Sequence, residues 1–78
     1  MSRRSANPVV VYDAMREAAT RLMGVYRRQL TIGGVEDPAM IQMRAVLAAV
    51  EAVDPHDAEA QRAATDEFRA RYAELRGE

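Results

Sequence analysis

The chain has 78 residues, contains no cysteine and has a formal net charge of −1. This length suffices for a single helical domain over residues 1–78, and the composition excludes disulfide bonds and thiolate zinc sites. No apolar run approaches the roughly 20 residues of a membrane-spanning helix and no secretory leader is recognisable, so we expect a cytoplasmic protein without a cofactor.

Three Asx-Pro pairs divide the sequence, at Asn7-Pro8, Asp37-Pro38 and Asp54-Pro55. An Asx side chain can accept the free N–H groups of a first helical turn, and the fixed φ of proline suits the first helical position. Because an alanine-rich stretch follows each pair, we predict an all-α, up-down-up unit of three helices. Their expected ranges are 8–31, 38–53 and 55–76, preceded by a flexible basic tail at residues 1–7.

The segment 8–31 has a one-sided apolar pattern. Apolar residues recur at spacings of three and four, which places them on one side of a helix. This stripe contains Tyr12, Met15, Ala19, Leu22, Tyr26 and Leu30. The triple valine at 9–11 leaves an extended entry open, and Gly33-Gly34 is expected to end the helix in a turn.

The segment 38–53 is apolar around most of its circumference. Such a helix must be covered on nearly all sides, so we expect it to be buried. Two neighbouring helices can cover one side well and the other only in part. We therefore expect a homodimer or a protein partner to cover the less protected side. The residues predicted to bind there are Met40, Ile41, Arg44, Ala48 and Glu51.

The segment 55–76 begins after Asp54, and Asp57 three residues later resembles a capping box. Pro55 interrupts the backbone hydrogen bonds of a continuous helix, so the chain either reverses there or continues as one kinked helix. We favour a true break. The alternative is a long helical hairpin that closes its core by dimerising.

Residues suited to catalysis are scarce. The chain has one histidine, His56, and its two serines lie in the first five residues, so no nucleophile with a nearby base can be assigned. A metal site of His56 with Asp54 and Asp57 is conceivable, but capping of a helix start explains these residues better. We predict neither an enzyme nor a bound metal.

The sequence therefore predicts a non-catalytic, protein-binding helical module, such as a small adaptor, regulator or inhibitor. Residues 1–35 contain six arginines and two acidic residues, a net charge of +4, whereas residues 36–78 contain five arginines and ten acidic residues, a net charge of −5. The alternative is a nucleic-acid-binding or accessory factor that contacts phosphates through the arginines of the first half. These are Arg3, Arg4, Arg16, Arg21, Arg27 and Arg28.

Overall fold

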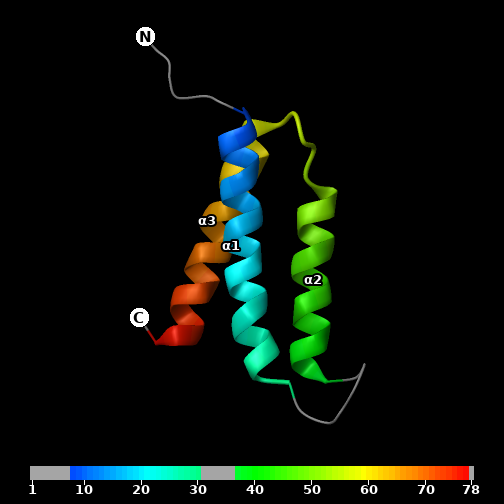
Figure 1. The fold of residues 1–78 in the computed structure, drawn as a ribbon, viewed down its shortest axis with the longest axis vertical. Helices are drawn as coiled ribbons and strands as arrows, with labels where there is room; N and C mark the ends of the chain where they lie inside the picture. Colours follow the sequence, from blue (N-terminus) through cyan, green and yellow to red (C-terminus); the bar gives the residue numbers. More distant parts are fainter. Residues whose placement is uncertain (1–7, 31–36, 78) are drawn as a thin grey trace.

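The computed structural model describes residues 8–30 and 37–77 of the chain. These residues form three α-helices and no strand. The helices are α1 (Pro8–Arg28), α2 (Pro38–Ala52) and α3 (Ala58–Arg76). The first and third run in one direction and the second runs in the opposite direction (Figure 1). The predicted all-α, up-down-up fold is confirmed, while the predicted tail 1–7 and the Gly33-Gly34 turn lie outside the described residues.

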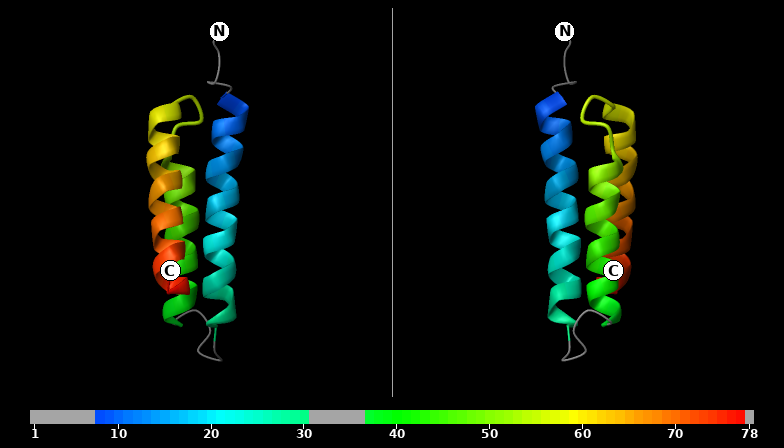
Figure 2. Two further views of the ribbon diagram at one scale, coloured as in Figure 1. Left: turned by 90° about the vertical axis from the view of Figure 1, so that its left-hand side faces the viewer. Right: turned by 90° about the vertical axis from the view of Figure 1, so that its right-hand side faces the viewer.

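The central helix is α1. It lies between the other two in Figure 1, and the side views of Figure 2 place it against both. The second and third helices each pack mainly on α1 and hardly contact one another. Accordingly, the side chains of Met15 and Leu22 on α1 are fully buried, with 0% exposure.

The second helix, which the sequence predicts to be buried, is covered on one side only within the described residues. Only three residues of α2 are buried, namely Ala39, Val46 and Val50, and all three belong to the core shared with α1. Five residues of that core come from α1, namely Met15, Ala18, Ala19, Leu22 and Tyr26, and one, Phe68, comes from α3.

 Counted over all buried apolar side chains of the described residues, α1 contributes six, because Val25 is buried as well although it lies outside this core.

The start of α2 follows the predicted local signal. Asp37 is its N-cap, and the Oδ1 atom of Asp37 accepts a hydrogen bond of 2.8 Å from the backbone N–H of Ala39. Pro38 occupies the first helical position, where its missing N–H costs nothing. The equivalent pair at Asn7-Pro8 cannot be compared, because Asn7 lies outside the described residues.

The predicted start of the third helix at residue 55 is wrong. The Oδ1 atom of Asp54 accepts from the backbone N–H of His56 at 2.8 Å, and the N–H of Asp57 donates to the carbonyl of Asp54 at 3.0 Å. These bonds close a turn over residues 54–57, so α3 begins at Ala58. Asp57 is the N-cap of α3, accepting from the N–H of Ala60 at 3.0 Å. The predicted break between the second and third helices is confirmed.

The C-terminal ends of the helices lie at or before the predicted residues. The backbone N–H groups of Gln29 and Leu30 donate to carbonyls three residues earlier, which tightens the chain and ends α1 at Arg28 rather than at residue 31. Helix α2 ends at Ala52 instead of residue 53. Helix α3 ends as predicted at Arg76, followed by Gly77 with a φ of 75°, a left-handed conformation that glycine adopts without strain.

Candidate functional site

Helix α2 is the most apolar of the three helices, and a larger fraction of its residues is exposed than in α1 or α3. Ten of its fifteen residues are exposed, and only Gln42, Arg44 and Glu51 among them are polar. The exposed apolar residues are Pro38, Ile41, Ala45, Leu47, Ala48, Ala49 and Ala52. Since an apolar helix normally buries its apolar surface, this helix is the strongest candidate for a binding site.

One side of α2 forms a continuous surface turned away from α1, which we name the outer face. It consists of Ile41, Arg44, Ala45, Ala48, Glu51 and Ala52, all of which are exposed. Its apolar members follow one another at intervals of four, three and four residues, the spacing by which one helix packs along another. The side chain of Ile41 is 50% exposed, which is unusual for a large aliphatic residue.

The structure places four of the five predicted binding residues together on this surface. Ile41, Arg44, Ala48 and Glu51 are exposed on the outer face, whereas Met40 is half-buried at its edge. Leu47, which sequence reasoning missed, is 48% exposed beside them. The signal that could have found it is its position at the edge of the buried stripe, because Leu47 lies three residues before the buried Val50 and three residues after the exposed Arg44.

The two charged residues of the outer face are separated by seven positions. This spacing puts Arg44 and Glu51 on the same side of α2, about 10 Å apart along the axis, which is too far for an ion pair with one another. Glu51 forms no ion pair with any part of the chain that the structure describes. Arg44 does have an interaction within its own chain. The face therefore has a positive and a negative end.

A shallow groove of about 160 Å³ adjoins the outer face where α2 meets α1. Leu47 and Val50 line it from α2, and Tyr12 and Met23 line it from α1. Arg16 and Glu51 lie on its opposite walls. The apolar surface thus continues from α2 toward α1, and this groove enlarges the area that a docked helix could bury.

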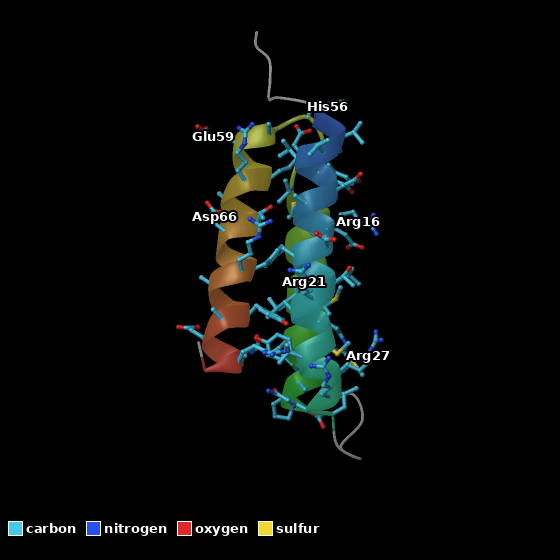
Figure 3. The ribbon with its side chains drawn as sticks, turned by 60° about the vertical axis from the view of Figure 1, so that its left-hand side comes forward. Arg16, Arg21, Arg27, His56, Glu59 and Asp66 are labelled. Atoms are coloured by element: carbon cyan, nitrogen blue, oxygen red, sulfur yellow. The ribbon has the colours of Figure 1, made fainter. Side chains whose placement is uncertain are left out.

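The arginines predicted for the nucleic-acid alternative do not form one surface. Arg16, Arg21, Arg27 and Arg28 are all exposed, whereas Arg3 and Arg4 lie outside the described residues. Figure 3 shows Arg16 and Arg27 projecting from the side of α1 away from α3. Arg21 instead lines a pocket with Arg69 and Tyr72 of α3, and Glu17 lines the same pocket. The positive charge is divided between two sides of the helix and mixed with carboxylates.

His56 is exposed in the turn that precedes α3, where its backbone N–H, rather than its ring, makes the bond described above. Within residues 8–30 and 37–77, no group of three or more His, Asp or Glu side chains is arranged to hold a metal ion. None of the helices in those ranges is both long enough and apolar enough to span a bilayer.

Comparisons of the chain with known protein families, with curated proteins and with solved structures found no match.

Proposed function

We propose that the protein is a non-catalytic module that binds another polypeptide through the outer face of α2. The observation that supports this most strongly is the mismatch between composition and burial: the most apolar helix contributes only three buried side chains. An exposed apolar surface bordered by charged residues is typical of an interaction site. As a small adaptor, regulator or inhibitor without catalytic residues, the protein would act by binding to its partner.

The affinity of such a module comes mainly from burial of apolar surface, at roughly 25 cal/mol per Å². Ile41 and Leu47 are the large side chains available for this burial, and the alanines allow a partner helix to approach closely. Arg44 and Glu51 then select the register and orientation of the partner, because a like charge placed opposite either one opposes binding. Since the chain lacks cysteine, such binding is compatible with the reducing cytoplasm, where we expect the protein to act.

Protein binding is better supported than nucleic-acid binding. The described arginines of α1 point to two different sides of the helix, and each side also presents a carboxylate, Glu17 or Glu51, in the pocket that the arginine lines. Phosphate binding requires several cations on one surface and weakens steeply as salt concentration rises. Apolar association through α2 is expected to persist in high salt.

A photo-crosslinking residue at position 48 tests the proposal. We expect irradiation of cells that make the Ala48 variant to give one dominant covalent adduct, because Ala48 lies at the middle of the outer face. Replacing Ala63 in the same way provides the matched control, since Ala63 is an equally small, exposed residue on α3. Adding Ile41→Glu to the position-48 variant is expected to abolish the adduct, because a carboxylate then lies where apolar surface must be buried.

The proposal is contradicted if positions 48 and 63 give the same adducts, or if Ile41→Glu leaves the position-48 adduct unchanged. Circular dichroism of the Ile41→Glu variant provides the folding control. Because Ile41 is half exposed and outside the core, the helical signal and the thermal midpoint of the variant should match those of the unchanged protein.

A further inference from the structure

The charge pattern of the outer face is complementary to itself. Arg44 and Glu51 lie at equal distances on either side of the level of residues 47 and 48 on α2. If two copies of α2 cross antiparallel at that level, related by a two-fold axis, Arg44 of each copy lies level with Glu51 of the other. One interface would thus contain two identical Arg–Glu pairs, as the symmetry of a homodimer requires.

The same pattern disfavours the parallel arrangement. When two identical helices lie side by side in the same direction and in register, each residue faces its own counterpart. Arg44 would then face Arg44 and Glu51 would face Glu51, so both pairs would repel each other. The distribution of charge therefore selects the antiparallel orientation.

The apolar residues of the outer face suit this orientation. Ala45 and Ala48 lie near the crossing point, and their small side chains let two helix backbones approach closely, while Ile41 lies toward one end. Each copy also presents Leu47 beside the crossing. Symmetric pairing would therefore bury the two most exposed large side chains of α2 together with the alanines.

Contacts within the chain leave the ion pairs available. Glu51 has no ion-pair partner among the described residues. Arg44 already interacts within its own chain, but a guanidinium has five N–H donors and can bind a further carboxylate.

We propose that the polypeptide bound by the outer face is a second copy of this chain, with the two α2 helices antiparallel and Arg44 of each copy paired with Glu51 of the other. This inference rests on the proposed function and identifies its partner. A pair of fifteen-residue helices forms a small interface, and interfaces below about 1,200 Å² belong to the weak, transient class. The dimer is therefore expected to dissociate on dilution.

Charge exchange between the two positions tests this arrangement. We expect light scattering of the purified protein, from micromolar to millimolar concentration, to show a reversible monomer–dimer equilibrium. The variants Arg44→Glu and Glu51→Arg each place like charges at both pairs, so each should dimerise about tenfold more weakly. An equimolar mixture of these two variants restores both pairs and should recover the dimer. The double variant, which exchanges the charges within one chain, should recover it as well.

Recovery of the dimer in the mixture is the decisive result. If the single variants failed to dimerise because they were unfolded, mixing them would not restore the dimer. The self-pairing is overturned if the unchanged protein remains a monomer at millimolar concentration, if the single variants dimerise as well as it does, or if neither the mixture nor the double variant recovers. The proposed function fails separately. A monomer whose position-48 adduct contains a different polypeptide leaves protein binding intact, whereas a monomer without a specific adduct contradicts both.

Discussion

At the scale of single residues, Gln61 holds the connection between α2 and α3. Its side chain is only 1% exposed, and its Nε2 atom donates to the carbonyl oxygens of Asp54 at 3.1 Å and Pro55 at 2.9 Å. These carbonyls belong to the turn between α2 and α3, where Pro55 prevents the two helices from continuing as one. A buried glutamine in the first turn of α3 is thus explained by the backbone carbonyl groups whose hydrogen bonds it satisfies.

Replacing Gln61 tests this role. Gln61→Leu removes both donors and leaves two carbonyl oxygens without them, so we expect a loss of about 1–3 kcal/mol in the free energy of unfolding. Gln61→Glu should cost more, because a buried carboxylate would face the same two oxygens. Urea denaturation followed by circular dichroism measures both losses. Gln29→Leu, at an exposed position, is the control and should change stability little. Equal stability of all three variants would contradict the assigned role.

The Oε1 atom of Gln61 limits the size of this effect. It is buried and accepts no hydrogen bond from the described residues. Leucine removes this unsatisfied acceptor along with the two donors, which partly offsets the loss. The leucine variant should therefore fall at the lower end of the range, and the glutamate variant above it.

At the scale of helices, α2 has two sides with separate tasks. Val46, which is 1% exposed, packs into the core against α1, whereas Ile41 on the outer face is 50% exposed. We expect Val46→Ala to destabilise the fold by about 2 kcal/mol through lost burial and the cavity that remains. Ile41→Glu should leave the unfolding free energy of the monomer nearly unchanged while it weakens association.

Thermal unfolding in dilute solution measures the stability of both variants, and light scattering at high concentration measures their association. The assignment of the two sides requires that each variant affects mainly one quantity. If Ile41→Glu unfolds the dilute protein as strongly as Val46→Ala, then Ile41 belongs to the core of the monomer.

Local signals predicted the helix starts well only where nothing competed with them. Asp37-Pro38 begins α2 as expected, because the cap and the proline act within a single turn. Asp54-Pro55 has the same sequence form, and the side chain of Asp54 makes the same bond to the residue two positions later. The carbonyl of Asp54, however, accepts from the N–H three residues later and closes a turn, whereas the carbonyl of Asp37 accepts from the N–H four residues later and continues as a helix. Asp57 then provides the cap of α3. Which of two adjacent caps starts a helix depends on the bonds of the whole turn, and the pair alone does not determine it.

The sequence did not reveal which helix is central. The apolar residues around α2 suggested that this helix needed the most contact with other helices, but composition does not determine which helices pack against one another. The missed signal lay in α1, where Ala14, Ala18 and Val25 extend the predicted apolar stripe to a second side. Ala18 and Ala14 line pockets together with residues of α3. A helix with two apolar sides of this kind can have two neighbours, and α1 does.

At the scale of the whole molecule, the central position of α1 explains why α2 is left exposed. Because α2 and α3 both pack on α1 and hardly contact one another (Figures 1 and 2), α3 gives α2 little cover. Three helices arranged around a common axis would each cover the other two. In this arrangement the outer face of α2 remains available to another chain.

The absence of cysteine from the chain allows the most direct measurement of that claim. A single cysteine introduced at position 48, in the variant Ala48→Cys, can be alkylated at a rate that reports its accessibility. Ala70→Cys, at an exposed position on α3, provides the reference. We predict that in cells Ala48→Cys reacts several-fold more slowly than Ala70→Cys, whereas in dilute purified protein the two react at similar rates. Equal rates in cells would contradict this prediction, because the outer face of α2 would then be open to solvent where the protein acts.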